Sequence, residues 1–133
     1  MGIPHVVDEL YEKIVLECVR IADGLEGKLL FAANVKVGAV SSAMVYEKGN
    51  GEALCFKFGS SLLFDLTYAL WEHSVSNSDD SEWRGLELVI AKGEFQFTLF
   101  YPDQLPADED FDDYREEIFV RHFGNRPIDY TNP

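Results

Sequence analysis

The hydrophobic positions near the N-terminus recur at the spacing of a helix. Apolar side chains between Val7 and Leu25 lie three or four residues apart, and charged side chains occupy most positions between them. Residues at this period share one face of an α-helix, so the pattern predicts an amphipathic helix over about Pro4–Asp23. Proline near its start and Gly24 after its end are typical of helix boundaries.

The period changes to two after Lys28, which is the spacing of β-strands. Three such runs follow one another and predict an antiparallel meander: residues 28–37, 40–47 and 54–58. Gly38 permits a turn between the first two runs. Asn50-Gly51 carries the signal of a tight hairpin between the second and the third.

A second helix is predicted after Ser60-Ser61, where a serine can cap the first turn. Its expected buried stripe consists of Leu62, Leu63, Leu66, Ala69, Leu70 and His73. A polar loop over residues 76–82 leads to two further strands, which Lys92-Gly93 separates. Apolar side chains alternate along both strands: Leu86, Leu88 and Ile90 in the first, and Phe95, Phe97, Leu99 and Tyr101 in the second.

A last helix is predicted over Asp113–Phe123, with Asp112 as its cap and Gly124 as its end. The predicted order is therefore α-βββ-α-ββ-α. This order indicates a single α+β domain over residues 1–133, with a largely antiparallel five-stranded sheet and helices packed on it. No internal repeat or linker divides the chain.

The aromatic residues are expected to serve mainly the core. Phe56, Phe58, Phe95 and Phe97 alternate along strands, and Trp71 is expected to pack as well, whereas Trp83 fits either a core or a surface position. In the last helix, three apolar side chains are expected to dock on the sheet and to turn the neighbouring carboxylates outward: Phe111, Tyr114 and Ile118.

The unusual feature of the composition is its excess of acidic residues. The chain of 133 residues has 24 acidic and 11 basic residues, a net charge of −13. Between Asp103 and Glu117 the sequence holds eight acidic residues and one arginine, Arg115, so this window carries −7. Phosphates would be repelled, which disfavours binding to nucleic acid or to anionic membranes. A basic protein is the expected partner.

Motifs for catalysis or for metal and cofactor binding are missing from the sequence. Asp108, Asp110 and Asp112 have the initial spacing of a calcium loop, but Asp113 replaces the required glycine and Phe119 the final glutamate. No zinc-helix, nucleophile-elbow or phosphate-loop motif occurs. No cofactor or metal is expected.

Cys18 and Cys55 are isolated and indicate buried, reduced thiols rather than a disulfide framework. The N-terminal segment lacks the basic and apolar regions of a secretory signal. A cytoplasmic location is therefore expected.

Two segments, together with the predicted element order, resemble the YezG-like antitoxin and immunity proteins: Glu9-Leu-Tyr-Glu-Lys-Ile14 and Tyr114-Arg-Glu-Glu-Ile-Phe-Val-Arg-His-Phe-Gly124. Members of that family are small acidic bacterial proteins that neutralise the toxic C-terminal domain of a secreted toxin, often a nuclease. The resemblance implies no catalytic residues. The Smi1/Knr4-like immunity proteins are also small, acidic and α+β.

Together with this resemblance, the sequence predicts a non-enzymatic immunity protein that binds a basic toxin domain of the nuclease class. The predicted contact residues are Asp108, Glu109, Asp110, Asp112, Asp113, Glu116 and Glu117, followed by Asp79, Asp80 and Glu82. Three alternatives stay open: a small ligand-binding or regulatory α+β domain, an enzyme that uses carboxylate catalysis, and acidic patches that only keep the protein soluble. The oligomeric state, monomer or dimer, is open too.

Overall fold

A computed structural model describes residues 3–36, 38–49, 53–75, 82–106 and 110–131. The elements are, in order, α1 (Ile3–Ala22), β1 (Leu29–Lys36), β2 (Ala39–Tyr46), β3 (Leu54–Lys57), α2 (Ser61–Val75), β4 (Gly85–Ala91), β5 (Glu94–Phe100), the 3-10 turn η1 (Pro102–Gln104), α3 (Phe111–Phe123) and β6 (Ile128–Asp129). The predicted order of helices and strands is confirmed as far as α3.

The sheet has six strands in the order β5-β4-β1-β2-β3-β6. All neighbours are antiparallel except β3 and β6, which run parallel, so the prediction of five strands was wrong by one. Strand β6 is two residues long and follows Pro127, so it is too short to show a period of two. Its pairing with Leu54 and Cys55 is a long-range contact.

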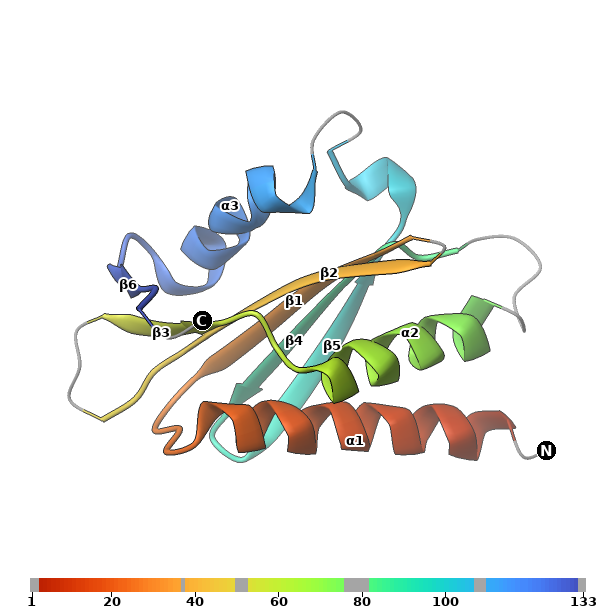
Figure 1. Cartoon of the computed structure of the whole chain (residues 1–133), viewed down its shortest axis with the longest axis horizontal. Helices are drawn as coiled ribbons and strands as arrows, with labels where there is room; N and C mark the ends of the chain where they lie inside the picture. The colour runs from red at the N-terminus through yellow and green to blue at the C-terminus, as the bar shows by residue number, and fades with distance from the viewer. Residues whose placement is uncertain (1–2, 37, 50–52, 76–81, 107–109, 132–133) are drawn as a thin grey trace.

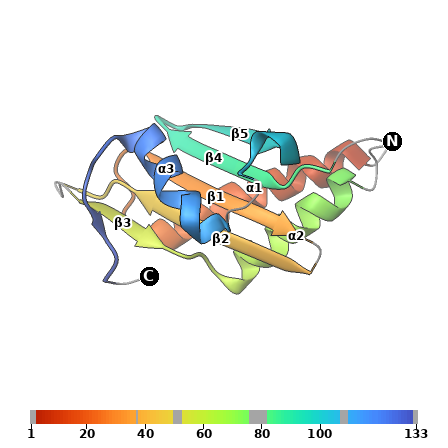
Figure 2. The same ribbon diagram turned by 90° about the horizontal axis from the view of Figure 1, so that it is seen from above.

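Helices cover both faces of the sheet. Figure 1 shows α1 and α2 below the sheet and α3 above it, and Figure 2 shows α3 lying over β1 and β2. Two cores result, one between the sheet and the α1–α2 layer and one beneath α3. The central strand β1 serves both, because Leu29 and Phe31 face the first core and Leu30 and Ala32 the second. This explains why its first five residues, 29–33, are all apolar instead of alternating with polar ones.

The α2 stripe was predicted only in part. Leu63 and Leu70 are buried, but Leu62 and His73 are exposed, and Thr67 and Trp71 are buried. Helix α2 packs against both α1 and the sheet. Its buried face therefore includes Thr67 and Trp71 and excludes Leu62 and His73.

Two of the four phenylalanines expected in the core are partly outside it. Phe56 is buried and Phe97 is half-buried, whereas Phe58 and Phe95 are exposed. Phe58 lies after the end of β3, and Phe95 lies at the start of the edge strand β5. No helix covers either position fully. Trp83 is buried.

A buried carboxylate joins α1 to the start of α2. Glu17 is 5% exposed and accepts hydrogen bonds from Arg20 Nε at 2.7 Å and from Ser60 Oγ at 2.6 Å. Ser60 Oγ also accepts from the Leu63 N–H at 3.0 Å, which confirms Ser60 as the cap of α2. The hydrogen bond from Arg20 is the main reason why the pKa of Glu17 falls to about 2, and the Ser60 bond adds to the shift against the opposing effect of desolvation.

Glu17 should make stability depend on pH in the acid range. Because its folded-state pKa lies below the ordinary 4.5, its contribution is complete above about pH 4.5 and is lost as pH falls toward about 2. We expect Glu17→Gln to flatten this part of the stability profile, measured by urea unfolding between about pH 6 and about pH 3. Glu12→Gln, at an exposed position of α1, is the control. Parallel profiles for wild type and Glu17→Gln would contradict the assignment.

Candidate protein-binding surface

Four apolar side chains anchor α3 to the sheet. Phe111, Tyr114, Ile118 and Phe119 are each at most 6% exposed and belong to the core beneath α3. Asn34 Nδ2 of β1 donates a hydrogen bond to the Tyr114 hydroxyl at 3.0 Å. The predicted docking role of the rings is thereby confirmed. Because successive turns of α3 bury these positions, the residues between them must face solvent.

The outward side of α3 carries a row of carboxylates, which we call the acidic face. It consists of five exposed side chains: Asp110, Asp112, Asp113, Glu116 and Glu117. Of these five, only Asp112 has an ion pair within the described residues, to Arg115 Nη1 at 3.3 Å, and Asp112 is itself 76% exposed. The acidic face therefore presents charge that the protein itself leaves largely uncompensated.

The start of α3 differs from the prediction. Asp110, not Asp112, is the N-cap, and the helix begins at Phe111 because that ring is buried in the core beneath it. The Asp110 side chain makes no capping hydrogen bond. Asp112 and Asp113 lie in the first turn, where the helix dipole favours negative charge. Part of the acidic face thus also stabilises the helix that carries it.

The remaining predicted contact residues are only partly described. Asp79, Asp80, Asp108 and Glu109 lie outside the described residues. Glu82 is exposed and pairs with Arg84 at 2.8 Å. Glu82 precedes β4, and η1 and the start of α3 follow β5. Glu82 and the start of α3 therefore both lie near the end of the sheet where β1 turns into β2 (Figure 1).

Exposed apolar side chains adjoin the acidic face and form what we call the apolar border. It consists of Phe58 (43% exposed), Val120 (48%) and Tyr130 (42%). The Phe56 ring links two of them, with centroid distances of 4.9 Å to Phe58 and 4.8 Å to Tyr130. Exposed rings beside charged residues are typical of protein interfaces.

A groove of about 270 Å³ connects the apolar border to the acidic face. Val120 and Tyr130 line it together with Glu116 and the buried Phe119. Sequence reasoning missed this border, because Phe58 was assigned to the core and Val120 and Tyr130 were given no role. Two features of the sequence could have indicated that Phe58 is exposed: the third strand is short, and Gly59 follows Phe58 immediately.

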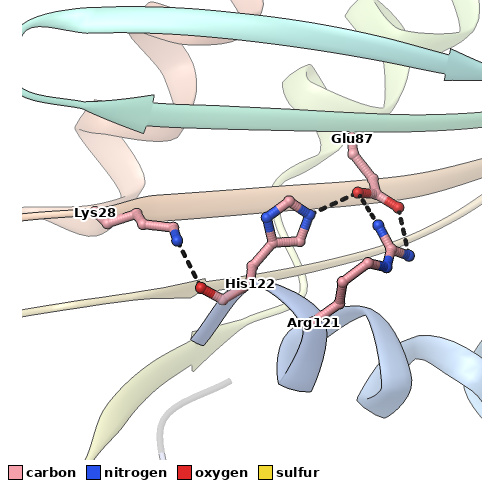
Figure 3. Close-up of polar contacts among 4 residues, drawn as sticks. All are labelled: Lys28, Glu87, Arg121 and His122. Carbon is pink, nitrogen blue, oxygen red and sulfur yellow. Dashed lines mark hydrogen bonds and ion pairs between the residues drawn. The ribbon is translucent and has the colours of Figure 1, made fainter. Parts of the chain in front are cut away.

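A network at the other end of α3 fixes the helix to β4 (Figure 3). Glu87 is buried and accepts hydrogen bonds from Arg121 Nη1 at 2.8 Å and Nη2 at 3.1 Å. His122 Nε2 lies 2.7 Å from Glu87 Oε1. Lys28 Nζ donates to the His122 carbonyl and lies over the Phe123 ring. Cations near the end of α3 are thus engaged within the protein, and the acidic face stays uncompensated.

We expect Glu87→Gln to lower the free energy of unfolding by about 1–3 kcal/mol. Removing one partner of a fully buried ion pair costs about 3–5 kcal/mol, but Arg121 is 55% exposed and regains water when the carboxylate is lost. Urea unfolding measures the change. Glu94→Gln, at an exposed position on β5, should change little. Equal stability of the two variants would contradict a stabilising role for the network.

No family model and no curated protein matches the chain. The described residues include no helix long and apolar enough to cross a membrane. They also contain no group of three or more His, Cys, Asp or Glu residues that could hold a metal ion. Cys18 is fully buried, as predicted, and burial raises the pKa of its thiol, whereas Cys55 is only half-buried, so the prediction was wrong for Cys55. The candidate site is the acidic face with its apolar border.

Proposed function

We propose that the protein is a cytoplasmic immunity protein, without enzymatic activity, that binds and neutralises the toxic C-terminal domain of a cognate bacterial toxin. The partner is a basic domain of the nuclease class. The observation that carries the proposal is the acidic face: exposed carboxylates, largely without internal ion pairs, on a helix that buried rings and the Glu87 network hold in place. The resemblance to YezG-like proteins points the same way.

The chemistry of a nuclease explains why such a surface would inhibit it. A nuclease holds the phosphates of its substrate with Lys and Arg side chains. Carboxylates of the acidic face would pair with those cations, and close charge pairs across interfaces contribute about 1.5–7 kcal/mol. The apolar border would supply the dehydrated contacts that complete a specific interface. The surface suits a complex over the toxin active site and equally one beside it.

Co-expression tests the proposal. The probe is a basic C-terminal domain of a large toxin, sought among the genes that neighbour the gene of this protein. Cells that express this domain alone should stop growing, and cells that also express the immunity protein should grow and yield a complex that co-purifies. Growth arrest that persists at full expression of the folded protein, with no co-purification, would reject the proposed function.

A further inference from the structure

Half of β2 is an unpaired sheet edge. Strand β3 pairs with β2 only over Met44–Tyr46, so residues 39–43 have no strand partner on this side within the described residues. Ser42 Oγ donates a hydrogen bond to the Phe58 carbonyl at 2.8 Å, where the chain leaves β3. We call residues 39–41 the open edge.

The register shows which backbone groups the open edge offers. The Val35 N–H donates to the Arg84 carbonyl at 2.7 Å, so the backbone groups of Val35 point toward β4. Val35 lies opposite Val40 in the antiparallel ladder. In such a non-hydrogen-bonded pair the backbone groups of both residues point away from each other. The Val40 N–H and C=O therefore point out of the sheet, toward a strand position that no described residue fills.

A hollow flanks the open edge on each face of the sheet. On the α2 side, a cavity of about 470 Å³ is lined by Val40, Phe64, Asp65, Tyr68 and Glu72, among others. Asp65 and Glu72 are exposed and have no ion pair within the described residues. The Tyr68 hydroxyl accepts a hydrogen bond from the Gly38 N–H at 3.0 Å. Carboxylates beside aromatic rings suit a cationic side chain.

The second hollow lies on the α3 side and belongs to the acidic face. Its volume is about 300 Å³, and Ser41, Asp110 and Asp112 line it together with Lys36. Lys36 offsets one of the two carboxylates, so this hollow is less negative than the one beside α2. The open edge thus runs between two acidic hollows, one on each face of the sheet.

We propose that an extended basic segment of the partner adds to the sheet as a strand at the open edge. This inference rests on the proposed function and names how the partner is recognised. The residue opposite Val40 exchanges hydrogen bonds with its N–H and C=O and places a Lys or Arg side chain between Asp65 and Glu72. The next residue points to the other face, toward Asp110 and Asp112, because successive side chains of a strand alternate.

The negative charge around the open edge favours a basic strand of a partner over a second copy of the chain. Each copy carries a net charge of −13 and presents carboxylates on both sides of the open edge. Two copies pairing there would bring like charges together, which is unfavourable. A strand with adjacent basic residues instead finds opposite charge on both faces.

A defined peptide tests the open edge independently of any toxin. The probe is a blocked peptide with adjacent Lys and Arg residues flanked by Thr and Val, titrated into the ¹⁵N-labelled protein. The Val40 amide signal should shift and its hydrogen exchange should slow. The same peptide with Glu in place of both basic residues should have no effect. A Val40 amide that stays unchanged, or that responds equally to both peptides, would overturn the proposal.

Substitutions locate the interaction. Val40→Pro removes an N–H that points away from β1, a place where an edge strand tolerates proline, so the fold should persist. It should weaken binding of the basic peptide roughly tenfold, since the hydrogen bond that the Val40 N–H donates is lost. Val40→Ala keeps the N–H and should bind normally. Asp65→Lys with Glu72→Lys should weaken binding, and Glu12→Lys on α1 should not. Equal binding by Val40→Pro and Val40→Ala would overturn strand pairing.

The toxin domain separates this inference from the proposed function. If the domain binds wild type and Val40→Pro equally well, the proposed function stands, and the open edge is rejected as the binding site of the toxin domain. If the basic peptide binds at Val40 but the toxin domain neither binds nor is neutralised, the edge is a basic-strand site and the immunity function is rejected.

Discussion

Replacing Asp110, Asp112 and Asp113 by lysine should lower the affinity for the basic toxin domain by about a thousandfold or more. Each replacement turns a favourable charge pair into a repulsive one, and charge pairs at interfaces are worth about 1.5–7 kcal/mol when close. The variant should stay folded, because all three side chains are exposed. Reversing charge at the helix N-terminus costs only about 0.3–1 kcal/mol per residue. Calorimetric titration measures the affinity, and circular dichroism confirms the fold.

A matched variant separates position from total charge. Replacing Asp8, Glu9 and Glu12 by lysine changes the net charge equally, but these exposed residues lie on α1, across the sheet from α3. Its affinity should fall only a few-fold through weaker long-range attraction. If both triple variants lose affinity equally, general charge rather than the acidic face governs binding.

Phe119→Ala should lower the free energy of unfolding by about 3–5 kcal/mol, the usual cost of removing a buried phenylalanine. The ring is 2% exposed and lies 6.3 Å from the Phe56 ring, between α3 and the sheet. A domain is typically stable by only about 5–15 kcal/mol, so this is a large fraction. The variant should also expose the α3 amides to hydrogen exchange before the rest of the protein unfolds.

Phe95→Ala is the control for this variant. Its ring is 50% exposed on the edge strand β5, so we expect a loss well below that of Phe119→Ala. Urea unfolding compares the two. Equal losses would show that the rings beneath α3 do not hold the helix on the sheet.

The parts of the fold that depend on local periodicity were predictable. The period of 3.6 residues in α1 follows directly from burial of one helix face, and the period of two in β4 from the packing of Leu86, Leu88 and Ile90 in the core beside α1 and α2. Strand β6 was missed because two residues show no period and the strand forms only through its pairing with Leu54 and Cys55. The exposure of Phe58 and Phe95 depends on where the covering helices end, which no local pattern records.

The candidate site was predictable to a similar degree. The spacing of Phe111, Tyr114 and Ile118 was enough to place the neighbouring carboxylates on the outer side of α3. The partners of α3 were not predictable: Glu87 lies 34 residues from Arg121 in sequence, and nothing near it indicates an ion pair. The open edge follows from the shortness of β3 against β2, a property of the pairing rather than of either strand.

Carboxyl footprinting of the complex tests the account most directly. A carbodiimide couples a neutral amine to accessible Asp and Glu side chains, and mass spectrometry locates the label in the free protein and in its complex with the toxin domain. We expect most of the labelling to be lost in the complex at Asp112, Asp113, Glu116 and Glu117, and to be kept at Glu9 and Glu12. Undiminished labelling of the α3 carboxylates in a complex that nevertheless forms would contradict it.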